Sequence, residues 1–159
     1  MRITILCVGK IKEKFYKDAI GEYSKRLSKY CKLNIIEVED EETSENAGEN
    51  LINTVKNKEG QRLKKHIKDG AYVISLAIEG EKFDSVELSE KIEKTAINGF
   101  SEIVFIIGGS LGISDEIKKM SNLLLSFSDM TFPHQLMRVI LLEQIYRSYR
   151  IINNEPYHK

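Results

Sequence analysis

The chain has 159 residues, of which 42% are hydrophobic, and its 24 basic and 24 acidic side chains give a formal net charge of zero. This length predicts one compact domain over residues 1–159 and hardly allows a second one. The longest apolar runs, such as residues 103–107, fall far short of the roughly 20 residues of a membrane-spanning helix, which excludes a protein that crosses a membrane by helices.

The amino-terminal stretch, residues 2–9, is apolar but lacks the length and the cleavage site of a secretory signal. We therefore expect a buried strand there and a cytoplasmic protein. Cys7 and Cys31 lack metal-ligand spacing and have no secretory context, so we expect them to be reduced, buried thiols. The histidines are widely separated in the sequence and predict no metal site; they are His66, His134 and His158.

Two kinds of apolar pattern alternate along the chain. Short stretches rich in β-branched residues predict strands at residues 2–9, 32–40, 71–78, 102–108 and 122–128. Apolar residues at helical spacing predict helices at residues 15–30, 44–68, 85–97, 114–120 and 133–152. Ser44 is expected to open the second helix, Gly60 to bend or interrupt it, and Ser85 to cap the third. The alternation predicts an α/β fold, with a mainly parallel sheet, helices on both faces and right-handed crossovers.

The charge is unevenly distributed, although the net charge is zero. Residues 2–32 hold nine Lys or Arg against three acids, a local charge of +6, while residues 37–49 hold seven acids and no base. One interpretation is that these charges simply face solvent on two surface helices and a loop. The other is a basic patch that contacts a polyanion, with the acidic segment turned away from it.

The last predicted helix begins at Pro133, which suits a first helical position. At about 100° per residue, one broad arc of this helix is apolar; it consists of Val139, Leu141, Leu142, Ile145, Tyr146 and Tyr149. Ile140 and Ile151 fall near the opposite, polar side, which predicts burial on more than one face. A homodimer would bury the second face, and a fully internal helix of a monomer is the alternative.

A glycine cluster follows the fourth predicted strand, in FIIGGSLG at residues 105–112. Gly108, Gly109 and Gly112 leave backbone amides exposed and make room for a flat ligand, although such a cluster also occurs in plain tight turns. The first strand-to-helix turn, where dinucleotide-binding folds carry several glycines, has only Gly9. No Gly-Lys-Ser or Gly-Lys-Thr phosphate loop occurs in the chain. A site of the common nucleotide-binding type is therefore not expected at the first turn.

The segment SFSDMTFPHQ, residues 126–135, predicts a loop at the carboxyl end of the last strand, where open α/β sheets hold ligands. Its Ser, Thr and backbone groups can surround an adenine, and Phe127, Met130 and Phe132 can supply apolar walls. The two phenylalanines are equally compatible with a plain core.

Three further candidates lie at or beyond the last helix. Arg138 falls within the apolar arc, so it either snorkels past the helix end or faces a ligand or a partner subunit. His134 offers a titratable group at the helix start, or only a local hydrogen bond. The tail, residues 155–159, has the composition of a frayed terminus, yet Tyr157, His158 and Lys159 offer a stacking ring, a titratable group and a phosphate contact.

Together, these segments closely resemble a small family of large-subunit ribosomal RNA methyltransferases, the H family, within the SPOUT methyltransferases. The resemblance covers the whole chain and rests on MRITILCVGKIKEKF at the start, FIIGGSLG, LSFSDMTFPHQLMRVILLEQIYRSYRI at residues 125–151, and the terminal PYHK. It implies a carboxyl-terminal trefoil knot, a homodimer, and S-adenosylmethionine bound in loops around the knot. The implied cofactor contacts are Leu76, Gly108, Phe127, Ser128, Asp129, Met130, Thr131 and Phe132.

The resemblance also implies a substrate: N3 of a pseudouridine in the helix 69 hairpin loop of 23S ribosomal RNA, methylated on the assembled ribosome. Such a transfer is an in-line attack on the sulfonium methyl without a metal, in which positioning and the removal of one proton supply most of the catalysis. We expect the tail of one subunit to close over the cofactor of the other, with His158 or Tyr157 handling the target base. Arg138 and Arg147 would hold phosphate or the geometry of the site, and His134 is a further candidate.

Two alternatives remain open at this point: a noncatalytic dimeric ribosome-binding or assembly factor, and an α/β enzyme that uses another adenine nucleotide. The joint presence of the adenosyl loop and the tail favours the methyltransferase. Because the net charge is zero, we expect RNA recognition by shape and composite surface rather than strong nonspecific affinity.

Overall fold

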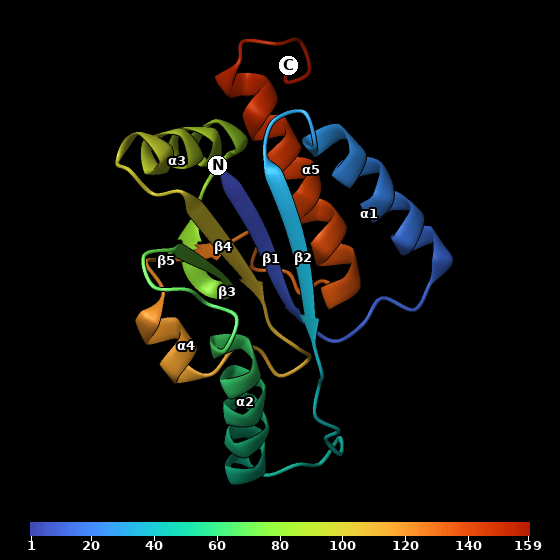
Figure 1. Cartoon of the computed structure of the whole chain (residues 1–159). Helices are drawn as coiled ribbons and strands as arrows, with labels where there is room; N and C mark the ends of the chain where they lie inside the picture. Colours follow the sequence, from blue (N-terminus) through green and yellow to red (C-terminus); the bar gives the residue numbers. More distant parts are fainter.

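The computed structural model describes residues 1–159, the whole chain, as alternating strands and helices (Figure 1). The strands are β1 (Arg2–Val8), β2 (Lys32–Val38), β3 (Tyr72–Lys82), β4 (Glu102–Ile107) and β5 (Leu123–Ser126). The helices are α1 (Lys14–Leu27), α2 (Glu49–Lys64), α3 (Ser85–Ile97), α4 (Asp115–Met120) and α5 (His134–Ile152). Each predicted strand and helix is present, which confirms the α/β alternation.

The strands form one sheet in the order β2-β1-β4-β3-β5, and all neighbouring pairs are parallel. The predicted mainly parallel sheet is therefore confirmed. The central strands β1 and β4 are buried along almost their whole length, as expected for a sheet that is covered on both faces. The trefoil knot that the resemblance implies stays a prediction.

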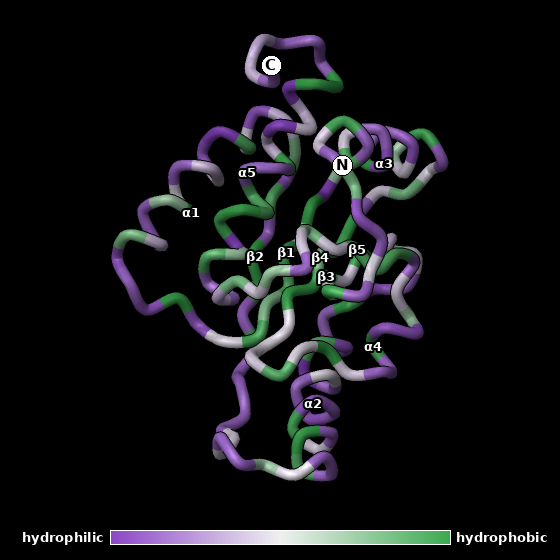
Figure 2. Tube along the Cα trace, turned by 180° about the vertical axis from the view of Figure 1, so that it is seen from behind, coloured by the Kyte–Doolittle hydropathy of each residue, from purple (hydrophilic) through white to green (hydrophobic).

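Helices cover both faces of the sheet. One face packs against α1, α3 and α5, through Leu27, Ile92 and Ile145 respectively. The other face packs against α2 and α4, through Leu63 and Ile117. Hydrophobic colouring concentrates along the strands in Figure 2, whereas α1 is largely hydrophilic. Because successive side chains of a strand point to opposite faces, a strand covered on both sides must be apolar at nearly every position.

α5 lies on the sheet between α1 and α3 (Figure 1). All of its residues are buried or half-buried, including Ile140 and Ile151 on the side predicted to be polar. Segments of the same chain therefore account for the burial of α5 on more than one face. That burial consequently gives no support to a homodimer, which stays a prediction.

α2 begins later than predicted. Residues 39–48 are irregular, and the helix begins at Glu49 with Gly48 as its N-cap, not at Ser44. α2 projects beyond the sheet edge with its first half outermost (Figure 1), so apolar packing is available only from Val55 onward. Leu51, predicted to face inward, is accordingly exposed.

Gly60 neither bends nor interrupts α2, which runs through it as a regular helix. Its role is close packing: a Cβ at this position would lie 2.6 Å from the Oγ of Ser114, the N-cap of α4. A glycine therefore allows α2 to approach the start of α4.

Two helix starts differ from the prediction by one residue. Asp84 caps α3 in a capping box with Glu87, so Ser85 is the first helical residue and not the cap. Pro133 is the N-cap of α5, and His134 is its first residue. Such one-residue differences are usual where a helix begins.

β3 extends to Lys82, beyond the predicted end at residue 78. Its pairing with β5 shifts register between Leu76 and Glu81. Gly80 permits this arrangement, because a Cβ there would lie 2.6 Å from the backbone of Leu124. The extension is polar in sequence, so local apolar periodicity could not predict it.

Both cysteines are free thiols. Cys7 is buried as predicted, whereas Cys31 is only half-buried. Burial raises the pKa of Cys7 to about 12 and the pKa of Cys31 to about 11, so both thiols are protonated at neutral pH. None of the helices is both long and apolar enough to cross a lipid bilayer.

Candidate functional site

A cleft of about 690 Å³ opens at the carboxyl edge of the sheet, a volume typical of small-molecule sites. Three segments line it: residues 76–79 at β3, the glycine loop at residues 107–113 after β4, and residues 125–134 between β5 and α5. Parallel strands end at the same edge of a sheet, which brings these three segments together although they are far apart in the sequence.

The glycine loop, residues 107–113, requires its glycines. A Cβ on Gly108 would lie 2.8 Å from Ile113 Cγ1 and 2.9 Å from the carbonyl carbon of Gly112. Gly112 itself has φ +89, a conformation that side chains disfavour. The loop closes with an antiparallel bridge between Gly109 and Gly112, in which Gly112 N–H donates to the Gly109 carbonyl at 3.0 Å. The N–H groups of Ser110 and Leu111 donate to no other backbone group, and both residues line the cleft.

The loop between β5 and α5 is ordered by its serines. Ser126 Oγ donates to the Ser128 carbonyl at 3.2 Å, and Ser128 Oγ accepts from the Met130 N–H at 3.0 Å. Phe127 packs against the core beside the cleft, so it is both core and cleft wall. Met130 is 73% exposed at the rim, and it therefore supplies an apolar surface that nothing else covers.

Seven of the eight predicted cofactor contacts line this cleft: Leu76, Gly108, Phe127, Ser128, Met130, Thr131 and Phe132. Asp129 does not line it, and its carboxylate instead pairs with Lys82 Nζ at 2.7 Å on the surface. Whether these seven residues hold a cofactor stays a prediction at this point, but their convergence is a property of the fold.

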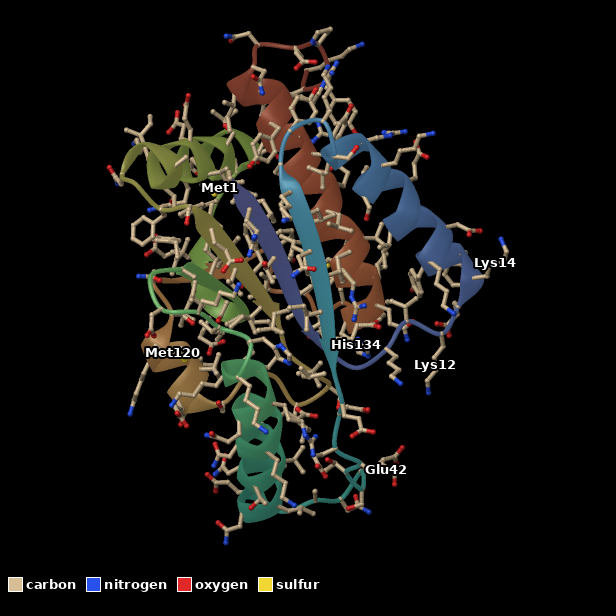
Figure 3. The ribbon with its side chains drawn as sticks, in the orientation of Figure 1. Met1, Lys12, Lys14, Glu42, Met120 and His134 are labelled. Carbon is tan, nitrogen blue, oxygen red and sulfur yellow. The ribbon has the colours of Figure 1, made fainter.

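His134 lines the cleft at the start of α5 (Figure 3). Its ring lies under Gly9, where a Cβ would come within 3.1 Å of Cε1. Nδ1 is buried and has no hydrogen-bond partner, so the local hydrogen bond considered as an alternative is absent. Burial, followed by the nearby charge of Arg138, lowers the pKa of His134. The imidazole is therefore neutral at neutral pH, because its surroundings disfavour the protonated ring.

Arg138 neither snorkels past the helix end nor lines the cleft. Its side chain is 2% exposed, Nη1 contacts Glu37 Oε2 at 2.6 Å, and Nη2 donates to the Gly9 carbonyl at 3.2 Å. Glu37 also accepts from the Ile11 N–H at 3.0 Å. Arg138 thus ties α5 to the ends of β1 and β2, and a direct contact with phosphate does not fit this buried position.

The tail packs onto the far end of α5 and is not frayed. Arg147 Nη2 contacts Glu143 Oε1 at 2.6 Å, and its Nη1 lies 3.3 Å from His158 Nδ1. The hydroxyl of Tyr157 donates to Glu143 Oε1 at 3.0 Å, and the guanidinium of Arg147 lies 4.7 Å from the Tyr157 ring centroid. Burial and the bond to Glu143 raise the pKa of Tyr157 to about 12. Tyr157, His158 and Arg147 therefore form one cluster.

This cluster lies at the opposite end of α5 from the cleft. His134 and Arg147 are 13 positions apart in the helix, which at 1.5 Å per residue corresponds to roughly 20 Å. Figure 1 shows the carboxyl terminus beyond the far end of α5, while Figure 3 places His134 at the near end. Within one chain, the predicted catalytic residues thus fall into two separate groups.

Some residues of the cleft carried no signal in the sequence. Glu79 and Lys118 both line it and form an ion pair with each other, and this pair lowers the pKa of Glu79. They come from β3 and α4, and no motif or periodicity relates them. The structure contains no group of three or more His, Cys, Asp or Glu side chains arranged to hold a metal ion.

A comparison with protein families matches residues 1–158 to the family described as a predicted SPOUT methyltransferase. Among curated proteins, the chain is 59% identical over 159 residues to ribosomal RNA large subunit methyltransferase H of Bifidobacterium adolescentis. It is 58% identical over 159 residues to the protein of that name from Clostridium botulinum strain Kyoto. Both alignments cover 100% of each chain.

Among solved structures, the fold is similar to that of a protein described as a probable methylase family protein from Haemophilus influenzae Rd KW20. The TM-score is 0.53, with 12% sequence identity, and the match covers 99% of this chain and 70% of the other. At this identity the likeness concerns the fold alone, and it agrees with the family that the sequence matches.

Proposed function

The chain belongs to the SPOUT methyltransferase family, and on this basis we propose that it transfers a methyl group from S-adenosylmethionine to large-subunit ribosomal RNA. The observation that carries the proposal is full-length identity of 59% to a protein named for that activity. The cleft supports it, because the three segments expected to hold the methyl donor meet there.

The cleft suits an adenosyl group. The backbone amides of Ser110 and Leu111, which donate to no other backbone group, can bond the edge of a purine. Leu76, Phe127 and Phe132 offer apolar walls for its faces. Asp129 is the one implied contact that faces elsewhere, so we assign it no part in holding the donor. When bound, the donor supplies an electrophilic sulfonium methyl, and the protein supplies the alignment for in-line attack.

We further propose N3 of a pseudouridine in the helix 69 loop of 23S ribosomal RNA, on the assembled ribosome, as the acceptor. Attack by N3 requires a group that accepts its proton. Tyr157 is held protonated by its raised pKa and donates to Glu143, so His158 is the better acceptor in the tail. His134, neutral and in the cleft itself, is the alternative within the same subunit.

A homodimer would reconcile the two separate groups of residues. The tail cluster lies roughly 20 Å from its own cleft along α5, too far for direct proton transfer. A two-fold dimer with antiparallel α5 helices would place the tail of each subunit over the cleft of the other. Arg147, which contacts the tail through His158, would then fix the tail for its partner's site.

The test is methyl transfer from labelled S-adenosylmethionine to purified ribosomes with and without pseudouridine in helix 69. We expect label in large-subunit RNA only when pseudouridine is present, and calorimetry should show the donor binding to the free protein. Transfer to both kinds of ribosome would refute the pseudouridine assignment alone. Absence of any transfer, despite donor binding, would refute the proposed catalytic activity.

A further inference from the structure

Glu59, on α2, is a buried acid that has no role in the proposed site. It is only 4% exposed. One carboxylate oxygen, Oε2, accepts a hydrogen bond from the Glu41 N–H at 3.0 Å. The other, Oε1, is buried and has no hydrogen-bond partner. An unpaired buried carboxylate oxygen costs stability and therefore requires an explanation.

The carboxylate faces the glycine loop from behind. A Cβ on Gly109 would lie 3.2 Å from Glu59 Oε1, 3.4 Å from Oε2 and 3.2 Å from Val8 Cγ1. Gly109 lines the cleft, whereas Glu59 does not. The free oxygen therefore lies next to a residue of the cleft lining that has no side chain.

No cation forms an ion pair with Glu59 within the chain. Arg62 donates to the Glu39 carbonyl and to the Glu41 carboxylate rather than to Glu59, although its charge favours the ionised form of Glu59 and so lowers its pKa. The other charged neighbours, Asp40 and Glu41, are acidic. Burial is the main cause that raises the pKa of Glu59, and the charge of Asp40 adds to it. The hydrogen bond from the Glu41 N–H and the charge of Arg62 act in the opposite direction, but burial outweighs them. The chain therefore gives this acid no ion-pair partner of its own.

Glu59 belongs to the part of α2 that packs against α4. The next residue, Gly60, packs so closely on Ser114 that a Cβ would come within 2.6 Å of its Oγ. Ser114 Oγ in turn accepts from the Ile117 N–H and caps α4. The backbone of α2 beside Glu59 is therefore held close to the start of α4.

We propose that Glu59 is a positioning residue that acts through Gly109 and provides the counter-charge for a cationic ligand, so that the cleft prefers the sulfonium donor to its neutral thioether product. The inference rests on the proposed function, from which the charge of the donor follows. A positive ligand charge favours ionised Glu59, and by reciprocity ionised Glu59 favours the positive ligand. The product carries no sulfonium charge and gains nothing from this coupling.

The experiment is calorimetry of S-adenosylmethionine and S-adenosylhomocysteine with the full-length protein and with Glu59→Gln. The amide keeps the size of the side chain, and its oxygen can still accept from the Glu41 N–H. It removes the charge and replaces the unpaired oxygen by an NH2 group. We expect donor affinity to fall on the order of tenfold, within the usual range of coupling between sites, with product affinity unchanged. A merely structural role would weaken both ligands together.

Glu45→Gln is the matched control, because Glu45 is exposed on the same acidic segment and its loss removes one charge away from the cleft. This control should keep the wild-type ratio of donor to product affinity. If Glu59→Gln does not fold, Glu59→Leu fills the same buried space without charge and is measured instead.

The outcomes separate the two proposals. If the wild type binds both ligands and Glu59→Gln keeps their affinity ratio, the role of Glu59 is overturned while the cofactor assignment stands. If the wild type binds neither ligand, the cofactor assignment fails and the role of Glu59 falls with it. A ratio that drops in Glu59→Gln and not in Glu45→Gln supports the assignment.

Discussion

Arg138 and Glu37 form an ion pair whose two ends differ in their access to water. The side chain of Arg138 is 2% exposed, whereas that of Glu37 is 34% exposed. Removing the carboxylate would leave a buried guanidinium with only the Gly9 carbonyl as acceptor. Removing the guanidinium would leave a carboxylate that water can still solvate. The two single substitutions should therefore not be equivalent.

We expect Glu37→Ala to lower the free energy of unfolding by about 3–5 kcal/mol, the usual cost of leaving a buried charge unpaired. Arg138→Met should cost about 1–2 kcal/mol, since its apolar replacement suits the surrounding core. Urea unfolding of both variants measures the difference. Equal costs, or a greater cost for Arg138→Met, would contradict this account of the pair.

The lowered pKa of His134 predicts that the free energy of unfolding depends on pH. Its pKa in the folded protein is lowered from 6.5 by burial and by Arg138, against a smaller opposing effect of Asp40. Below pH 6.5 the unfolded chain therefore binds a proton more readily than the folded protein, and this part of the stability is lost as pH falls toward the folded pKa.

Unfolding measured between about pH 8 and pH 5 should show this loss in the wild type and not in His134→Gln, because the side chain of glutamine does not titrate. The carboxylates that begin to titrate at the acidic end are common to both proteins, so the difference between the two curves isolates His134. Parallel curves across this range would show that the imidazole is not held neutral by its surroundings.

Gly21 in α1 and Gly60 in α2 both lie within a helix, but their surroundings in the fold differ. A Cβ added to Gly21 in α1 would meet no atom within 4 Å, while one added to Gly60 in α2 would lie 2.6 Å from Ser114 Oγ. A glycine inside a helix normally costs stability relative to alanine. In α1 an alanine would avoid that cost. In α2 the glycine is needed, because the absence of a Cβ allows the helix to pack on α4.

Gly21→Ala should raise the free energy of unfolding by about 0.5–1 kcal/mol. Gly60→Ala should lower it by about 1–3 kcal/mol, because the added methyl group displaces the cap of α4 or forces the helices apart. Thermal and urea unfolding of the pair provide matched measurements. Stabilisation by Gly60→Ala would mean that α2 and α4 are not in close contact.

The separation of cleft and tail concerns the molecule as a whole, because it makes the proposed site depend on two subunits. His158→Ala should abolish methyl transfer through the tail, and Gly108→Ala should do so by crowding Ile113 and Gly112 in the glycine loop. In a mixed dimer, however, one of the two sites would combine an intact cleft with an intact tail.

Co-expressed His158→Ala and Gly108→Ala subunits should recover roughly a quarter of wild-type methylation, because about half of randomly formed dimers are mixed and each has one intact site. Each variant alone serves as the control. No recovery in purified mixed dimers would contradict tail donation between subunits, and full activity of His158→Ala alone would remove His158 from the reaction.

The proposed recognition of the ribosome also concerns the surface of the molecule. Lys10, Lys12 and Lys17 are exposed around the start of α1, beside Phe15, whose residue is 63% exposed. Figure 3 shows Lys12 and Lys14 directed away from the body of the protein, although Lys14 pairs with Asp18. The unpaired lysines together with an exposed ring are suited to RNA backbone and bases.

Lys12→Ala should weaken ribosome binding and reduce the slope of its salt dependence by roughly 1, the expected effect of losing one phosphate contact. Lys94→Ala, an exposed lysine on α3, is the control and should leave the slope unchanged. An identical slope for both variants would place the RNA surface elsewhere.

Local pattern was sufficient to predict the alternation of strands and helices, the parallel sheet and two segments of the cleft, the glycine loop and the loop after β5. Those features follow from hydrophobic periodicity and from the rule that parallel strands end at one edge. The third segment, at Leu76, was indicated only by the resemblance to the family. The late start of α2 and the polar extension of β3 escaped prediction, because they depend on packing at the edge of the sheet.

Which polar groups meet, by contrast, depends on the fold. Arg138 pairs with Glu37, which is 101 residues earlier in the sequence. The carboxylate of Glu59 lies next to Gly109, and the tail packs at the end of α5 that is far from the cleft. Such contacts follow from how the helices cross the sheet, which periodicity does not encode. The residues of the site could therefore be named from the sequence, while their division into two distant groups, and the acid behind the glycine loop, became visible only in three dimensions.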